Sequence, residues 1–85
     1  MSAIPLRAYA TSGMVDVATV NSLITFGEPM LSETPAEPGY NRTFRAWIRL
    51  RGGGRVFGPI QSSAPGAAFA LLAKLRAEEA KGRAL

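Results

Sequence analysis

The sequence predicts an α+β fold: a small antiparallel sheet of about four strands with one C-terminal helix packed on one face. The stretch 42–60 alternates apolar and polar side chains on both sides of three consecutive glycines, which is typical of a β-hairpin. Residues 63–82 carry apolar side chains at helical spacing. A length of 85 residues suits one domain, 1–85, with a thin hydrophobic core.

The first 26 residues contain two candidate elements. Apolar and polar side chains alternate from Ile4 to Ala10, which predicts a strand, and Pro5 places that strand at a sheet edge. The next segment, 14–26, is rich in β-branched residues, which favours a strand. Its apolar residues are also spaced as in a helix that starts after Asp16. The sequence therefore leaves strand and helix open for this segment.

Residues 27–41 combine three prolines with three glutamates. No regular element is expected to tolerate three prolines at this spacing, so the sequence predicts a long, mobile acidic loop. Its carboxylates, on Glu28, Glu33 and Glu37, could compete with a ligand for the neighbouring basic surface.

The predicted hairpin, 42–60, is strongly basic and has two distinct faces. Successive side chains of a strand point to opposite sides, so Phe44, Ala46, Ile48 and Leu50 share one face. The turn length decides where Phe57 points. A two- or four-residue turn places Phe57 opposite Ile48 in the core, and a three-residue turn places it on the other face. We expect Phe57 in the core, because burying it contributes about 1.5–3 kcal/mol.

The predicted C-terminal helix, 63–82, has clear start and stop signals. Ser63 is a favourable N-cap, Pro65 fits the first turn, and Gly82 ends the helix. The buried stripe is expected to consist of Ala68, Leu71, Leu72 and Leu75.

Composition excludes several function classes. The chain lacks His and Cys, which removes Ser-His-Asp triads, cysteine nucleophiles and the usual zinc sites. We therefore predict no enzyme activity, no cofactor and no metal. No targeting segment or membrane-length apolar stretch is evident, so a soluble, cytoplasmic protein without membrane contact is expected.

Charge is distributed unevenly and defines the candidate site. Residues 1–41 have a net charge of −3 and residues 42–85 a net charge of +7. Arginines and one tryptophan gather on the polar face of the hairpin, a composition suited to nucleic acid or to a protein hot spot. A solvated face without a partner is the third alternative, and an exposed edge strand could support a homodimer. The predicted binding residues are Arg45, Trp47, Arg49, Arg51 and Arg55.

The order of features in 43–75 also resembles known families. The run Phe44-Arg-Ala-Trp-Ile-Arg-Leu-Arg-Gly-Gly-Gly-Arg-Val-Phe, followed by Ser62-Ser-Ala-Pro-Gly-Ala-Ala, looks like the arm-site DNA-binding domains of phage and transposon tyrosine integrases. That resemblance implies a three-stranded sheet, with a helix behind it, that contacts DNA through Arg45, Trp47, Arg49 and Arg51. The pattern is also similar to small phage-encoded inhibitors, including anti-CRISPR proteins. That second resemblance implies blockage of a host protein or nucleoprotein complex by direct contact.

Overall fold

The computed structural model describes residues 3–34, 38–39, 41–83 and 85. It confirms an α+β fold in which a four-stranded antiparallel sheet carries a C-terminal helix, with two further short helices near the N-terminus. The elements in chain order are β1 (Ala3–Pro5), α1 (Leu6–Thr11), α2 (Val17–Ile24), β2 (Gly27–Thr34), β3 (Thr43–Leu50), β4 (Arg55–Gln61) and α3 (Ala64–Ala80).

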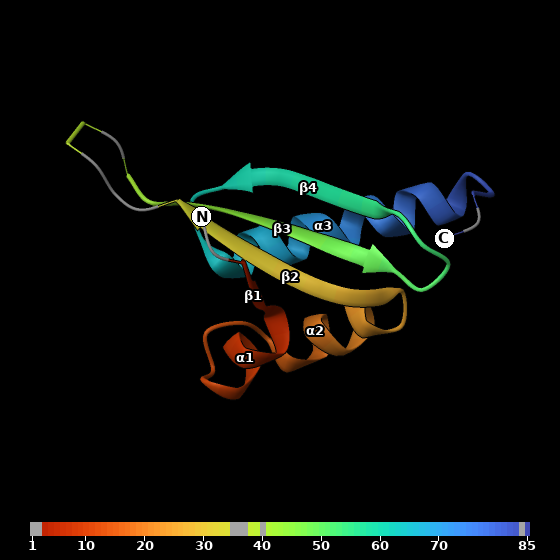
Figure 1. Cartoon of the computed structure of the whole chain (residues 1–85), viewed down its shortest axis with the longest axis horizontal. Helices are drawn as coiled ribbons and strands as arrows, with labels where there is room; N and C mark the ends of the chain where they lie inside the picture. Colours follow the sequence, from red (N-terminus) through yellow and green to blue (C-terminus); the bar gives the residue numbers. More distant parts are fainter. Residues whose placement is uncertain (1–2, 35–37, 40, 84) are drawn as a thin grey trace.

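The helices gather on one side of the sheet. The strands lie in the order β1-β2-β3-β4, and all neighbours are antiparallel. Helix α3 packs against β3 and β4, whereas α1 and α2 pack near β2 (Figure 1). The sheet therefore has an inner face that meets the helices and an outer face that no described element covers.

The core lies between the inner face and the helices. Its centre is formed by Leu31, Ala46 and Ile48 of the sheet, which are fully buried. The predicted stripe on α3 is confirmed, because all four of its residues are buried against this layer. Ser63 caps α3 as expected, since its Oγ accepts a hydrogen bond from the Gly66 amide at 3.1 Å.

The N-terminal prediction is wrong beyond Pro5. Only Ala3–Pro5 forms a strand, which pairs with Met30–Ser32, and the chain then turns into α1. Two of the apolar positions in the apparent alternation, Ala8 and Ala10, are alanines, and alanine is the strongest helix former. Leu6, at the first position of α1, is fully buried in the core.

The segment 14–26, for which the sequence left strand and helix open, contains helix α2. Asp16 is the N-cap residue of α2, and its carboxylate accepts a hydrogen bond from the Thr19 hydroxyl at 3.3 Å. Val20 and Leu23 lie three residues apart and are both buried. Tertiary burial of this helical stripe outweighs the strand preference of the β-branched residues.

The predicted acidic loop is wrong for residues 27–34, which form β2 between β1 and β3. Pro29 is buried opposite Ile48, at a point where β1 has already ended. The strand therefore has only one neighbour there, and an edge position tolerates proline. Residues 35–37 and 40 of the predicted loop lie outside the described residues.

The hairpin is confirmed, but its register differs from the prediction. Trp47 pairs with Phe57 and Arg49 with Arg55, so Phe57 lies on the outer face. The Leu50 amide donates to the Gly54 carbonyl at 3.0 Å, which closes a turn over residues 51–53. Further along, Gly58 and Pro59 together face Ala46 in a β-bulge.

No helix in the described ranges is long and apolar enough to cross a membrane.

Gly27 provides a test of the β2–β3 pairing. A Cβ atom at Gly27 would lie 2.0 Å from the Arg49 carbonyl oxygen, so Gly27→Ala forces the two strands apart. We expect a loss of about 1–3 kcal/mol or more in the free energy of unfolding, measured by urea denaturation. Gly52→Ala is the matched control, because its Cβ meets nothing within 4 Å. Equal stabilities of the two variants would contradict this pairing.

Leu72 tests the orientation of α3. Its side chain is 5% exposed, so Leu72→Ala should lower the free energy of unfolding by about 2–5 kcal/mol. A melting curve that matches the wild type would mean that α3 presents a different face to the sheet.

Candidate functional site

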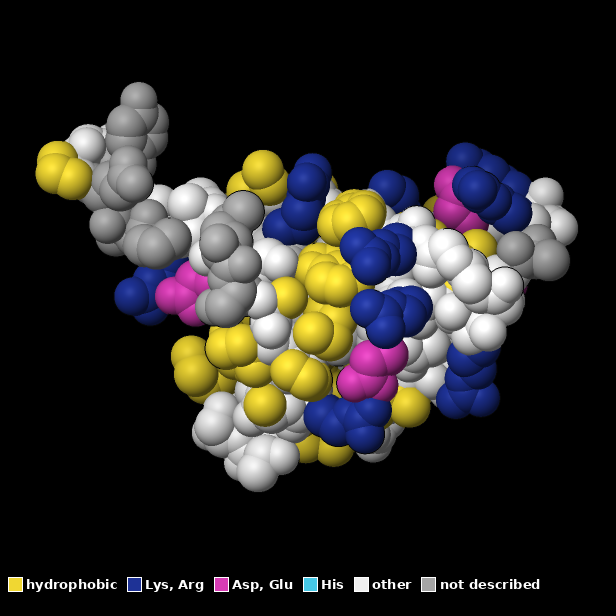
Figure 2. Space-filling model, viewed as in Figure 1, with side chains coloured by type: hydrophobic (Ala, Val, Ile, Leu, Met, Phe, Trp, Pro, Cys, Tyr) yellow, Lys and Arg dark blue, Asp and Glu magenta, His cyan; other side chains and the backbone are white. Residues whose placement is uncertain are grey.

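The outer face is the side of the sheet that points away from α3. Its cross-strand rows follow from the register, since paired residues share a face. A band of apolar side chains crosses this face, and Lys and Arg side chains lie beside it (Figure 2). The outer face comprises Ala3, Pro5, Glu28, Met30, Ser32, Thr34, Thr43, Arg45, Trp47, Arg49, Arg55, Phe57 and Ile60.

Two aromatic rings and two guanidiniums form an aromatic stack at the centre of the outer face. The rings of Trp47 and Phe57 stack with centroids 5.6 Å apart and an interplanar angle of 26°. Arg55 lies over the indole at 5.3 Å, and Arg45 lies over the phenyl ring at 5.8 Å. Each cation–π contact contributes about 0.5–1 kcal/mol at an exposed site. The stack therefore holds its charged and aromatic groups in one arrangement.

Hydrogen bonds to the sheet fix the stack further. The Trp47 Nε1 donates to Ser32 Oγ at 3.0 Å, which ties the indole to β2. The Arg45 Nε donates to the Gly58 carbonyl at 3.2 Å, which ties the guanidinium to the bulge in β4. An arginine has five N–H donors, so Arg45 keeps others for a ligand.

The outer face carries an excess of positive charge. Its acidic residue, Glu28, forms an ion pair with Arg7, which offsets the negative charge of the carboxylate. Arg49 is exposed, and the structure gives it no ion pair within the described ranges. Glu33, another acid of β2, pairs with Arg42 at 2.9 Å. Within the described ranges neither glutamate forms an ion pair with Arg45 or Arg55 of the aromatic stack, and Glu37 lies outside the described residues.

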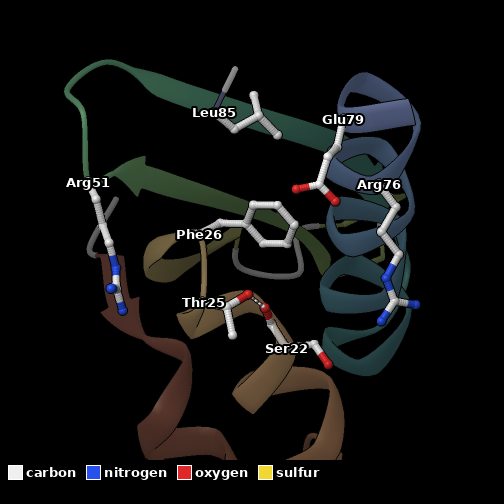
Figure 3. A pocket seen from close by; sticks show the side chains of 7 residues that line it. All are labelled: Ser22, Thr25, Phe26, Arg51, Arg76, Glu79 and Leu85. Carbon is white, nitrogen blue, oxygen red and sulfur yellow. Dashed lines mark hydrogen bonds between the residues drawn. The ribbon is translucent and has the colours of Figure 1, made fainter. Parts of the chain in front are cut away.

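Arg51 does not join the other predicted binding residues. It lies in the turn after β3, and its Nη2 donates to the Ile24 carbonyl at the end of α2 at 3.0 Å. Arg51 therefore lines a separate cavity of about 480 Å³ between α2 and α3, where Arg76 and Glu79 stand on the opposite side (Figure 3). Two guanidiniums and one carboxylate line this cavity, whereas the outer face has an excess of positive charge.

The sequence also missed three apolar members of the outer face. Met30 lay in the predicted loop, and Phe57 was expected in the core. Ile60 is placed opposite Arg45 by the bulge, and its exposed fraction is 60%. The Gly58-Pro59 pair was the available signal, because glycine and proline inside a strand often mark a bulge.

The two sheet edges are protected against pairing with another strand. At the β4 edge, Lys74 Nζ donates to the Phe57 carbonyl at 2.6 Å, and Pro59 lacks an amide hydrogen. The opposite edge, β1, is three residues long and ends in a proline. Short strands, lysine and proline are devices that oppose strand addition. These features oppose strand addition, and the homodimer through an edge strand that the sequence left possible stays a prediction.

Side chains with displaced titration lie elsewhere in the fold. Burial, helped by the Glu33 carboxylate, raises the pKa of Tyr9 on α1 above its usual value. A hydrogen bond from Arg83 lowers the pKa of Glu78 on α3. Among the residues that the structure describes, no group of three or more acids could hold a metal ion.

Comparisons with known protein families, with curated proteins and with solved structures gave no match. The functional argument therefore rests on the chemistry of the outer face.

Phe57 tests the hairpin register. Its side chain is 43% exposed, so Phe57→Ala should lower the free energy of unfolding by about 1–3 kcal/mol, because the loss of the aromatic pair adds to a partial loss of apolar burial. Truncating a core phenylalanine costs about 3–5 kcal/mol instead. The same variant should shift the fluorescence of Trp47, the single tryptophan of the chain. Phe69→Ala, on an exposed position of α3, should leave that emission unchanged. A loss in the free energy of unfolding as large as that for a core phenylalanine in Phe57→Ala would refute the register.

Proposed function

We propose that this protein is a non-catalytic binding module that takes single-stranded nucleic acid on its outer face. The observation that carries the proposal is the aromatic stack on an open sheet, where stacked rings and unpaired guanidiniums lie side by side. Single strands are commonly recognised by these two groups: bases stack on aromatic or guanidinium planes, and arginines contact phosphates.

The charge pattern supports a polyanion as the ligand. Because Arg7 offsets the charge of Glu28, the cations Arg45, Arg49 and Arg55 outweigh the acidic charge in the described part of this surface. These guanidiniums lie on both sides of the ring pair along β3 and β4. A strand that crosses the rings would therefore meet a cation before and after the stacked bases.

The shape of the surface favours a single strand over a duplex. The major groove of DNA admits a helix or a two-stranded ribbon. Here β3 and β4 belong to a four-stranded sheet, and the rings lie on its face. Unpaired bases can reach rings on an open sheet, as they do in known sheet-based RNA-binding modules.

A second candidate is a small inhibitor that blocks a host protein or nucleoprotein complex by direct contact. It is favoured by the exposure of Phe57 and Ile60 beside Trp47 and the arginines. Tryptophan and arginine are typical hot-spot residues of protein interfaces. Nucleic-acid binding leads because the free charge of the outer face has one sign.

The salt dependence of binding tests the proposal. A fluorescein-labelled single-stranded dodecamer should bind with an affinity that falls steeply with salt, with a slope of about −0.7 per phosphate contact. Arg49→Gln should reduce the magnitude of the slope by about 0.7, and binding should quench Trp47 fluorescence. Arg76→Gln, which removes the same charge from α3, is the matched control and should leave the slope unchanged.

Two outcomes would contradict the proposal. The first is no binding to single-stranded DNA or RNA at high micromolar protein in low salt. The second is an equal change of slope in the Arg49 and Arg76 variants, which would indicate attraction by net charge alone. Capture of a protein complex that Trp47→Ala abolishes, without any affinity for nucleic acid, would establish the inhibitor instead.

A further inference from the structure

A small cavity adjoins the aromatic stack on the outer face. It has a volume of about 180 Å³ and lies toward the end of the sheet where β2 ends and β3 begins. Pockets for drug-sized ligands measure about 300–1,000 Å³, so this cavity suits one planar ring. Its lining residues are Ser32, Thr34, Thr43, Phe44, Arg45, Trp47, Phe57 and Ile60.

The β-bulge explains why the cavity exists. In a regular strand, side chains two residues apart share a face. The extra residue at Gly58-Pro59 instead puts Phe57 and Ile60 on the outer face three residues apart, opposite Trp47 and Arg45. Bulges often redirect side chains beside functional sites. Here the bulge places an aromatic wall and an aliphatic wall at two sides of the same cavity.

The polar lining is complementary to the edge of a nucleobase. Ser32 Oγ accepts the hydrogen bond from the indole of Trp47, which leaves its own hydroxyl hydrogen as a donor. Thr43, the partner of Thr34 in the β2–β3 pairing, adds a second hydroxyl-bearing side chain to the same lining. A base has apolar faces and hydrogen-bonding edges. The cavity likewise has apolar walls from its aromatic and aliphatic side chains and a polar wall from its hydroxyl-bearing side chains.

Arg45 supplies the remaining contact that a nucleotide needs. Its Nε is held by the Gly58 carbonyl and its guanidinium lies over Phe57, so the side chain has a fixed position at the cavity. The other guanidinium N–H groups are donors for a phosphate oxygen. A nucleotide with its base in the cavity would place its phosphate beside this arginine.

We propose that this cavity is a subsite for one unstacked nucleobase of the bound strand. The inference rests on the proposed function, which it makes specific: the outer face would hold the strand through phosphate contacts and fix its register by capturing one base. The base is held between the rings of the aromatic stack and Ile60, with the hydroxyls along its edge.

An abasic ligand separates base capture from phosphate contact. A single-stranded dodecamer and an abasic strand of the same length carry the same phosphates, and only the first carries bases. Wild-type protein should bind the abasic strand about tenfold more weakly at every salt concentration, because this factor lies within the range that one stacked base contributes. The salt slopes of the two strands should be equal.

Two variants assign the difference to the cavity. Ile60→Ala and Thr43→Val change exposed or half-buried lining residues outside the aromatic stack, and circular dichroism checks their fold. Both should weaken binding of the intact strand and shrink the tenfold difference toward unity, while leaving the abasic affinity unchanged. Phe69→Ala, an exposed apolar truncation on α3, is the control and should preserve the difference.

The outcomes distinguish the two proposals. Salt-dependent binding with equal affinity for intact and abasic strands would refute the base subsite and also the base stacking that the proposed function requires. A tenfold difference that persists in both cavity variants would place the base contacts elsewhere on the outer face, which refutes the subsite and leaves the proposed function standing. Absence of binding to either strand would overturn the subsite together with the function on which it depends.

Discussion

The close approach of α3 to the sheet at Gly58 determines which side chains each face presents. A Cβ atom at Gly58 would lie 3.1 Å from the Ala46 carbonyl oxygen and 3.3 Å from the Leu71 Cα. Because glycine has no side chain, the backbone of α3 packs closely against the bulge, and Leu71 is fully buried. Once α3 covers the inner face of β3 and β4, their arginines and aromatic rings are left on the opposite side. The candidate site is thus a consequence of how the core is packed.

The same arrangement explains how a basic surface persists beside acidic residues. Each of the two described glutamates of β2 has an arginine partner from outside the aromatic stack. Exposed pairs of this kind contribute little to stability, typically below about 1 kcal/mol. Their effect here is on the electrostatic field, because Arg7 and Arg42 offset the negative charges nearest to Arg45, Arg49 and Arg55. Local pairing makes the outer face more positive than the composition of its strands alone would indicate.

The sequence was informative where local pattern and tertiary contacts agree. The alternation of β3 and the leucine stripe of α3 each depend on one buried face, so both were predicted with their orientations. Strand β2 was missed because it contains Pro29. A proline is tolerated there only because β1 ends before it reaches Pro29, and the sequence does not show where β1 ends. The side of Phe57 depends on the turn geometry after Leu50, since one residue of register reverses the face. Arg51 was wrongly predicted on the outer face for a related reason. The alternation of side chains stops at the turn, and the Arg51 guanidinium donates to the Ile24 carbonyl instead.

The strand order also has a kinetic meaning. Since β2, β3 and β4 are neighbours both in the chain and in the sheet, two successive hairpins can form with little loop-closure entropy. Low contact order is associated with fast folding. The connection from β1 to β2 is different, because it contains α1 and α2 and pairs three residues only. Refolding of this chain should therefore begin in its basic half, and the outer surface of β3 and β4 would take shape before the N-terminal strand completes the sheet.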